Sequence, residues 1–236
     1  MTTQVVTRRL KFSDIPQAME VEKAAWQPHC SDEYVFKPEH LQSQIETFSE
    51  GALGAFIGES LVGFVITEIV SSQFIESVST WDEMTDSGYI KRVHSAGGDT
   101  MYGVDLSVHP KLAPWGVSER LLYAEGKLAI KMSLKRIVLG GRIPRYYKYA
   151  DKMAAEQYVY ATHPRSGKPL DPELQLYLKS GLKIIKVLPN YMPDPESMNF
   201  GVLLEWKNPF YSVTKHFKPL GLFFSSIARF SDNRTT

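Results

Sequence analysis

The sequence predicts a mixed α/β fold, from three observations. Strand and helix patterns follow one another along the 236 residues in the order β-α-α-β-β-β-α-β-α-β-β. Residues 102–142 read in succession as a strand, a tight loop, a helix and a strand. A later helical segment stops at Gly181, a residue suited to a helix C-terminus. These features predict a sheet covered by helices, with a loop–helix junction that presents backbone N–H groups to an anion.

The first half of the chain contains strand signals around two predicted helices. Residues 5–12 are rich in β-branched and apolar side chains and predict the first strand. Ser13-Asp-Ile-Pro16 supplies the hydroxyl, acid and proline typical of a helix start, and residues 37–48 place apolar side chains at helical spacing. Residues 52–58 and 61–69 predict a hairpin, whereas residues 71–101 show little periodicity and predict a long excursion.

The second half continues the alternation up to about residue 209. The predicted strands span residues 102–108, 136–139, 182–188 and 200–206, and the predicted helices span residues 117–132, 153–160 and 171–181. From Phe210 onward the sequence is aromatic and basic without a clear period. We therefore expect one domain over residues 1–209 and an extension over residues 210–236, which packs on that domain or on a second subunit of a homodimer.

Composition narrows the classes of function. The formal net charge is +1, which gives no reason to expect nucleic acid or an anionic membrane as a partner. The sole cysteine, Cys30, cannot form an internal disulfide, so a cytoplasmic protein is expected. No secretory signal and no apolar run long enough to span a bilayer is evident. His29, Cys30 and His109 have no partners at metal-ligand spacing, so no metal site is expected.

Two carboxylates stand out within apolar strands. Asp105 lies in the middle of the strand at residues 102–108, on the face opposite Val104, Leu106 and Val108. Apolar surroundings raise the pKa of a carboxyl group and suit it to act as a general base or to bind a cationic amine. The alternative is a structural carboxylate that accepts hydrogen bonds from its neighbours. Glu68, on the preceding strand, is the second candidate base.

The loop and helix after this strand resemble the pyrophosphate-binding segment of the GNAT superfamily of acyl-CoA-dependent N-acetyltransferases. That family carries Arg or Gln, two variable residues, Gly, one variable residue, and Gly or Ala; the corresponding residues here are Ala113, Pro114, Trp115, Gly116, Val117 and Ser118. Gly116 matches and Ser118 is small, whereas Ala113 departs from the pattern. The alternative from the loop alone is a simple helix-entry turn. Tyr177, four residues before Gly181, corresponds to the tyrosine that protonates the departing CoA thiolate in many GNAT enzymes.

This resemblance implies a mostly antiparallel central sheet, flanked by helices, whose fourth and fifth strands splay apart. It also implies transfer of an acetyl group from acetyl-CoA to the primary amine of a small molecule. Tyr177 is then the general acid, unless it is a structural helical tyrosine, and Asp105 is the base or the amine anchor. The implied cofactor contacts come from Leu106, Ser107 and Val108 for the pantetheine arm, and from Trp115, Gly116, Val117, Ser118, Glu119 and Arg120 for the pyrophosphate.

Residues 140–151, beginning Gly-Gly-Arg-Ile-Pro, are more distinctive. They resemble the GNAT-like domain that is often fused in bacteria to nitrilase-type carbon–nitrogen hydrolases. Arg142, Tyr146 and Tyr147 are expected to line an acceptor pocket, with Arg142 available to a carboxylate or phosphate; the alternative is a surface segment packed on the sheet. The competing function is a catalytically silent GNAT-fold module that binds CoA or a protein, which the altered phosphate loop favours.

Overall fold

The computed structural model describes residues 4–27, 29, 32–217 and 219–227. Within them one seven-stranded sheet has the order β1-β2-β3-β4-β5-β7-β6. The strands are β1 (Val5–Arg9), β2 (Ala52–Ile57), β3 (Ser60–Val70), β4 (Thr100–Val108), β5 (Arg136–Arg142), β6 (Lys183–Leu188) and β7 (Gly201–Lys207). β4 and β5 pair in parallel and every other neighbouring pair is antiparallel. The mixed, mostly antiparallel sheet is therefore confirmed.

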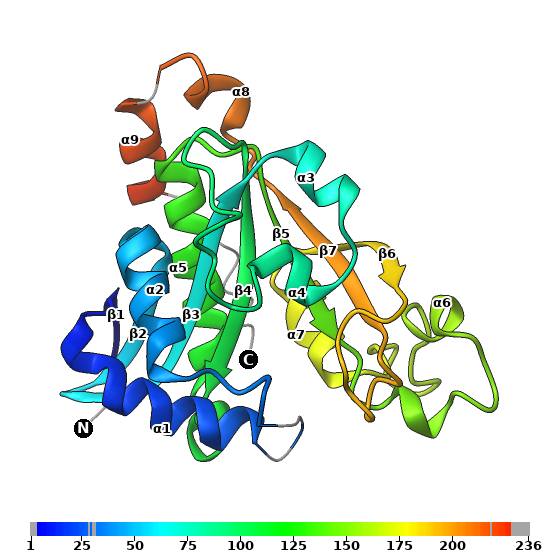
Figure 1. Cartoon of the computed structure of the whole chain (residues 1–236). Coiled ribbons are helices and arrows are strands. Elements are labelled where there is room, and N and C mark those ends of the chain that lie inside the picture. Colours follow the sequence, from blue (N-terminus) through cyan, green and yellow to red (C-terminus); the bar gives the residue numbers. More distant parts are fainter. Residues whose placement is uncertain (1–3, 28, 30–31, 218, 228–236) are drawn as a thin grey trace.

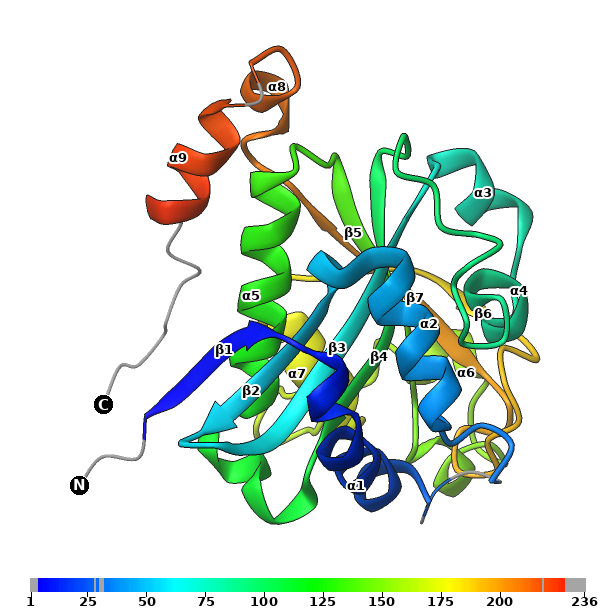
Figure 2. The same cartoon turned by 60° about the vertical axis from the view of Figure 1, so that its left-hand side comes forward.

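Helices cover both faces of this sheet. The α-helices are α1 (Ile15–Trp26), α2 (Pro38–Phe48), α3 (Ser72–Ser77), α4 (Trp81–Thr85), α5 (Val117–Lys131), α6 (Ala155–Tyr158), α7 (Pro172–Lys179), α8 (Tyr211–Thr214) and α9 (Pro219–Ile227). The 3-10 helices are η1 (Phe12–Asp14), η2 (Ser49–Gly51), η3 (Pro110–Trp115) and η4 (Tyr146–Lys148). Figures 1 and 2 show α1 and α2 on one face of the sheet and α5 on the other.

The sequence explains the start and end of α7, the helix that carries the candidate acid. The Asp171 side chain accepts hydrogen bonds from the N–H groups of Glu173 (2.9 Å) and Leu174 (3.3 Å), and Pro172 occupies the first turn. Past its end, Gly181 adopts a φ of +89°, a left-handed conformation that a side chain would strain. These local signals place Tyr177 on a short helix whose ends are both fixed.

Two segments hold more structure than expected. Residues 71–99 contain α3 and α4, and β4 begins at Thr100, two residues early. Ser71 and Thr80 cap these helices, accepting hydrogen bonds from the N–H groups of Phe74 (3.1 Å) and Glu83 (3.2 Å). The prediction of a plain excursion was wrong, because helices of six and five residues are too short to show periodicity.

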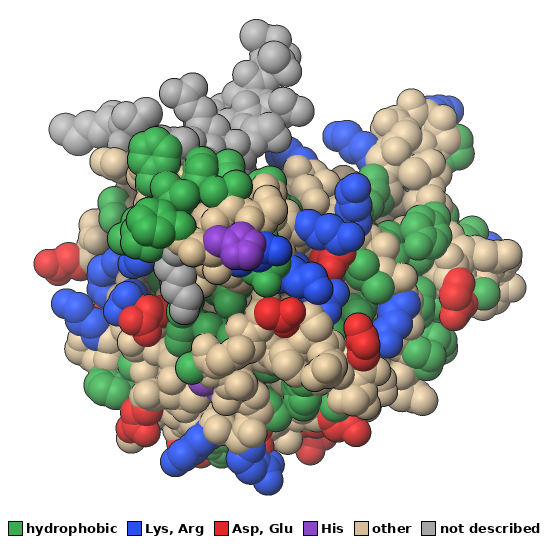
Figure 3. Space-filling view, turned by 90° about the horizontal axis from the view of Figure 1, so that it is seen from above, with side chains coloured by type: hydrophobic (Ala, Val, Ile, Leu, Met, Phe, Trp, Pro, Cys, Tyr) green, Lys and Arg blue, Asp and Glu red, His purple; other side chains and the backbone are tan. Residues whose placement is uncertain are grey.

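The end of the chain also forms helices, α8 and α9. α9 packs on the C-terminal end of α5: a Cβ atom at Gly221 would lie 2.7 Å from the carbonyl oxygen of Lys131. The exposed apolar side chains of this end are Val213, Phe217, Leu222 and Phe223. Figure 3 shows hydrophobic side chains gathered beside lysine and arginine side chains on this side of the molecule. The domain boundary at residue 209 and the homodimer remain predictions.

None of the helices in the described residues combines the length and apolar character that a membrane crossing requires.

Candidate active site

The central feature of the site is a wedge between β4 and β5. The two strands pair only from Thr100 opposite Arg136 to Gly103 opposite Leu139, after which they separate. β5 continues to Arg142 on β7, while β4 continues to Val108 on β3. A cavity of about 300 Å³ opens where they part. Its walls come from α1 on one face of the sheet and from α5 and α7 on the other.

A β-bulge redirects β4 at the start of the wedge. Ile66 of β3 lies opposite Asp105 and Thr67 lies opposite Gly103, so Val104 is an extra residue. Its carbonyl oxygen accepts a hydrogen bond from the indole Nε1 of Trp81 (3.0 Å). The simple alternation that placed Val104 on one face and Asp105 on the other therefore does not hold at this point of the strand.

Beyond the bulge, β4 turns toward the cavity backbone groups that β3 does not pair. The N–H of His109 donates to the carbonyl oxygen of Val62 (3.0 Å), which makes this a hydrogen-bonded pair of the antiparallel ladder. Bonded and non-bonded pairs alternate along such a ladder, so the N–H and C=O groups of Leu106 and Val108 point away from β3. Both residues line the cavity, on the side that β5 has left.

Two buried carboxyl groups lie together on the α1 side. Glu22 accepts hydrogen bonds from the Ser107 hydroxyl (2.8 Å) and from the N–H of Phe36 (3.0 Å), and the Ser107 oxygen accepts one from Trp26 Nε1 (2.7 Å). Burial and the charge of Asp105 raise the pKa of Glu22 well above its usual range. Burial raises the pKa of Asp105 to about 7, although hydrogen bonds from Ser107 and Trp26 oppose the shift.

This arrangement gives the two carboxyl groups different roles. Asp105 ionises near neutral pH, whereas burial and the charge of Asp105 favour the protonated form of Glu22. Asp105 Oδ2 is buried and makes no hydrogen bond with any described residue. An ionisable group with a free oxygen and a pKa near 7 can accept a proton from a bound amine.

Tyr177 faces the same cavity from α7. Its side chain is buried and lines the cavity. Burial, together with the charges of Glu173 and Asp105, raises the pKa of Tyr177 well above 10. The phenol therefore keeps its proton at physiological pH and is free to donate a hydrogen bond into the cavity.

α5 directs its N-terminus toward the cavity. Gly116 precedes the helix, and Ser118 in the first turn lines the cavity. The first N–H groups of a helix have no partner within the helix and carry a partial positive charge. Glu119 is held by an ion pair with Lys179 of α7 (3.6 Å). A helix N-terminus of this kind suits an anion beside the wedge, and binding of the CoA pyrophosphate there remains a prediction.

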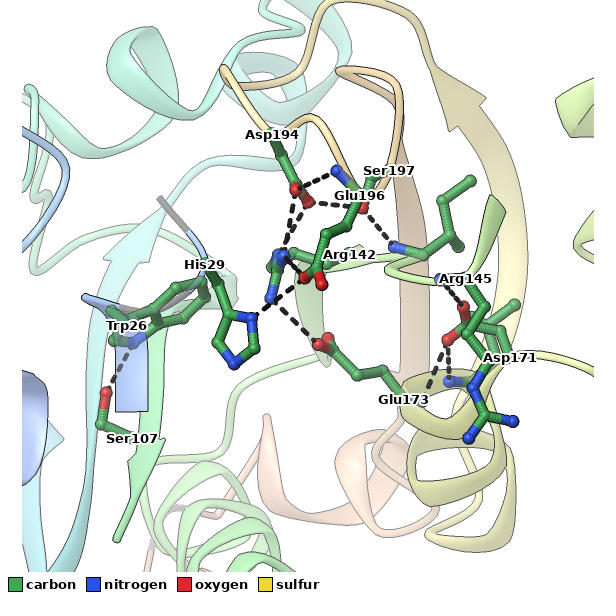
Figure 4. A network of polar contacts seen from close by, with 12 residues as sticks. Trp26, His29, Ser107, Arg142, Arg145, Asp171, Glu173, Asp194, Glu196 and Ser197 are labelled. Carbon is green, nitrogen blue, oxygen red and sulfur yellow. Dashed lines mark hydrogen bonds and ion pairs between the residues drawn. The ribbon is translucent and has the colours of Figure 1, made fainter. Parts of the chain in front are cut away.

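Arg142 lies at the end of β5, in a network of acids (Figure 4). Its guanidinium donates to Asp194 (2.8 and 3.0 Å) and to Glu196 (3.0 Å), and it lies 3.6 Å from Glu173. Glu196 also contacts His29 (3.0 Å). Arg142 lines the cavity, which agrees with its predicted position. Three carboxylates already neutralise the cation, which corrects the expectation that Arg142 is available to a substrate carboxylate or phosphate.

The other predicted pocket residues lie outside the wedge. Tyr146 is buried between Tyr158 and Phe200, and its hydroxyl donates to the carbonyl of Met153 (3.2 Å). Tyr147 is 48% exposed. Neither tyrosine lines the cavity, so the alternative of a segment packed on the sheet describes them. Glu68 is fully buried away from the cavity; burial and the charge of Asp86 raise its pKa to about 9.

Solved structures share this fold. The chain is similar to the loading GNATL domain of CurA from Lyngbya majuscula, with a TM-score of 0.71 and 20% identity over 87% of this chain and 98% of that one. It is also similar to the GphF GNAT-like decarboxylase in complex with isobutyryl-CoA, with a TM-score of 0.69 and 18% identity over 86% and 99% of the two chains. No family model matches the sequence.

A curated relative decides the family. The chain is 38% identical, over 204 residues, to a Bacillus subtilis (strain 168) protein named "Uncharacterized N-acetyltransferase YkwB"; the match covers 86% of this chain and 89% of that protein. The chain belongs to the GNAT family of N-acetyltransferases. A second relative, "Probable hydrolase YhcX" of the same organism, is 34% identical over 209 residues, which cover 88% of this chain and 39% of YhcX.

The acyltransferase class is thus established, and the wedge is where the family's splayed strands were expected. The structure brings Asp105, Tyr177 and Ser118 to one cavity and adds Glu22, which sequence reasoning missed. The sequence did indicate that Glu22 is buried, because it lies one helical turn before Trp26, on the face of α1 that buries Ala18. Among the described residues, no three His, Cys, Asp or Glu side chains gather so as to hold a metal ion.

Proposed function

We propose that this acyltransferase moves a short acyl group, acetyl in the simplest case, from CoA to the primary amine of a small molecule. The observation that carries the proposal is the position of Asp105 and Tyr177 on one cavity: a carboxyl group ready to accept a proton and a phenol ready to give one. The bound acyl-CoA supplies a thioester, whose carbonyl carbon the amine attacks.

The chain's own groups suit the proton transfers of this reaction. The Asp105 carboxylate binds the substrate ammonium, takes one proton, passes it to solvent and leaves a neutral amine beside a carboxylate again. The amine nitrogen bonds to the thioester carbonyl carbon, and the carbon–sulfur bond then breaks to release a thiolate. Tyr177 donates its proton to that sulfur, and Asp105 takes the second proton from nitrogen as the amide forms. The proton on Asp105 then restores the Tyr177 phenol, so the products are an amide, free CoA and the one proton already given to solvent.

The acyl-CoA is expected on the α5 side of the wedge. The C=O of Leu106 and the N–H and C=O of Val108 face away from β3 and provide a strand-like edge for the pantetheine arm. The N–H of Leu106 donates to Asp105, and Ser107 between the two residues is held by Glu22. N–H groups of residues 115–120 at the start of α5 and the hydroxyl of Ser118 suit the pyrophosphate. Two GNAT neighbours of known structure contain isobutyryl-CoA or coenzyme A, which supports CoA as the cofactor.

The acceptor is expected on the α1 side, beside the carboxyl groups. Glu22 and Asp105 line that wall, and Arg142 is already surrounded by acids. A cavity with ionisable acids and no free cation among its described lining residues favours a cationic amine over an anionic acceptor.

The cytoplasm is the compartment that we infer from the single cysteine. Fusion of this domain to a nitrilase-type hydrolase in some relatives remains a prediction. It is supported by YhcX, because the match covers only 39% of that protein and leaves room for a further domain.

A direct test is to mix the purified protein with acetyl-CoA and a panel of small primary amines, and to measure the release of free thiol. Release that depends on one amine class, with the acetylated amine identified by mass spectrometry, would support the proposal. Micromolar binding of acetyl-CoA without turnover on any amine, alcohol or thiol would instead leave the silent module as the better description. No binding at millimolar acetyl-CoA would overturn the cofactor assignment itself.

Replacing Tyr177 with phenylalanine is expected to lower kcat about a hundredfold, because the thiolate then leaves without a proton donor. This loss of kcat is small for the removal of a general acid, because the thiolate of a thiol with a pKa of about 8.5 leaves readily without a proton. The Kd for acetyl-CoA, measured by calorimetry, is expected to stay within about threefold. An unchanged kcat would show that Tyr177 is structural.

Replacing Ser118 with aspartate is expected to weaken acetyl-CoA binding at least tenfold, because it puts a negative charge where the pyrophosphate is expected. Ser166→Asp makes the same change on an exposed loop and is the matched control. Calorimetric titration of both variants measures the effect. Equal affinities would place the pyrophosphate elsewhere.

A further inference from the structure

Glu125 is the one carboxyl group in the α5 wall of the cavity that the proposed reaction leaves without a role. It lies in the middle of α5, is 1% exposed and lines the cavity. Its Oε1 atom is sealed from solvent and has no hydrogen-bond partner among the described residues. Burial is the one cause that raises its pKa, to about 8, so no described neighbour offsets its desolvation. A buried polar group without a partner is costly and calls for an explanation.

The position of Glu125 places it at the closed end of the wedge. Ser118, Leu122 and Glu125 are spaced four and three residues apart, so they lie on one face of α5, and all three line the cavity. A Cβ atom on Gly103 would be 3.5 Å from Glu125 Oε1. Gly103 and Leu139 form the last pair of the β4–β5 ladder. The carboxyl group therefore lies close to the backbone of Gly103, which has no side chain, at the point where β4 and β5 meet.

The acyl part of the donor fits this end. Glu125 is the seventh residue after Ser118, so it lies about 10 Å along α5 from the expected pyrophosphate. Glu125 and Tyr177 line the same cavity, so the carboxyl group shares it with the expected sulfur. A thioester held at Tyr177 then has its acyl group between that hydroxyl and the closed end of the wedge.

We propose that Glu125 hydrogen-bonds a polar substituent on the acyl group, so that the protein prefers a hydroxyacyl- or oxoacyl-CoA donor to the plain alkyl acyl-CoA of the same length. This inference rests on the proposed function, since it places the acyl-CoA on the α5 side. It adds what that function leaves open, the chemical class of the acyl group.

The chemistry of the carboxyl group supports a neutral substituent. At neutral pH Glu125 is mostly protonated, so it donates to a hydroxyl or carbonyl oxygen and can accept from a hydroxyl. A plain alkyl group would leave it unpaired, and sites built to hydrogen-bond a substrate reject the analogue that lacks the group. A carboxylate substituent is disfavoured because Glu125 shares the cavity with Asp105 and Glu173.

The test compares donors that differ by a single hydroxyl. Calorimetry measures the Kd of CoA, butyryl-CoA and each enantiomer of 3-hydroxybutyryl-CoA for the wild type, Glu125→Gln and Glu125→Leu. We expect one hydroxybutyryl enantiomer to bind the wild type at least tenfold more tightly than butyryl-CoA. Glu125→Gln, which keeps hydrogen-bonding groups, is expected to retain part of this preference, and Glu125→Leu to lose or reverse it. CoA itself is expected to bind all three proteins with similar Kd.

The outcomes separate this inference from the function on which it rests. Tight binding of CoA with equal affinity for butyryl- and hydroxybutyryl-CoA in the wild type would overturn the inference alone. The same would follow if Glu125→Leu kept the full preference. Failure of every CoA ligand to bind the folded wild type would overturn both the cofactor assignment and the inference.

Discussion

Replacing Asp105 with asparagine is expected to lower kcat/KM about a thousandfold at pH 8, because the amide can neither accept the amine proton nor attract the ammonium. The wild-type kcat/KM is expected to fall as the pH drops below about 7, where Asp105 becomes protonated. The variant is expected to lack this acidic limb. Steady-state rates between pH 5.5 and 9 with one amine substrate measure both effects.

The control for this substitution is Asp151→Asn, the same change at an exposed position outside the cavity. It is expected to keep the wild-type rate and pH profile. The asparagine variant must also keep its Kd for acetyl-CoA, which shows that the wedge is intact. If Asp105→Asn retained both the rate and the acidic limb, the base would have to be another group, with Glu22 the nearest candidate.

Replacing Asp194 with alanine is expected to lower the free energy of unfolding by about 3–5 kcal/mol, because it leaves the buried Arg142 guanidinium without its principal partner. Asp194 is 1% exposed and also accepts hydrogen bonds from the Ser197 hydroxyl and the N–H of Glu196. Urea unfolding followed by circular dichroism measures the change. The loss is expected to appear in stability before it appears in catalysis.

The pH dependence of this loss has a defined sign. Burial alone would raise the pKa of Asp194, but the hydrogen bonds and charge of Arg142 outweigh it and hold that pKa below its usual range. The ionised Asp194 carboxylate therefore stabilises the folded protein fully above the pKa of an aspartate in the unfolded chain, about 3.9. This stabilisation is lost as the pH falls through the lower pKa that Asp194 has in the folded protein. Glu196→Ala removes a half-exposed partner of the same arginine and is expected to cost less than about 1 kcal/mol. Equal costs for the two variants would contradict the assigned roles.

The fold was predictable because its longer elements carry strong local signals. The fifteen residues of α5 repeat apolar side chains at helical spacing, and the eleven of β3 form a nearly continuous buried run. Helices α3, α4 and α8 escaped prediction because four to six residues hold too few turns for a period to appear. Their stability comes from caps and from tertiary contacts.

The site was predictable only where one residue carried its own signal. Asp105 could be recognised as an acid within an apolar strand. Tyr177 could be recognised because it lies four residues before Gly181, as the general acid does in many GNAT enzymes. Glu22 and Glu125 lie on amphipathic helices, where an acid normally faces solvent, so their burial depends on how α1 and α5 meet the sheet. The expectation that Arg142 is free was wrong for the same reason, since its acidic partners at residues 194 and 196 are 52 and 54 residues away in the sequence.

Trp81 connects β4 to the loop that holds Arg142. Its indole donates to the bulged residue Val104 on β4, and its backbone N–H donates to the carbonyl oxygen of Tyr191 (2.8 Å), three residues before Asp194. The segment at residues 71–99 therefore sets the spacing between the strand that carries Asp105 and the loop that holds Arg142. A protein engineer who shortens this apparently dispensable insertion would change the width of the active site, and with it the range of substrates that fit.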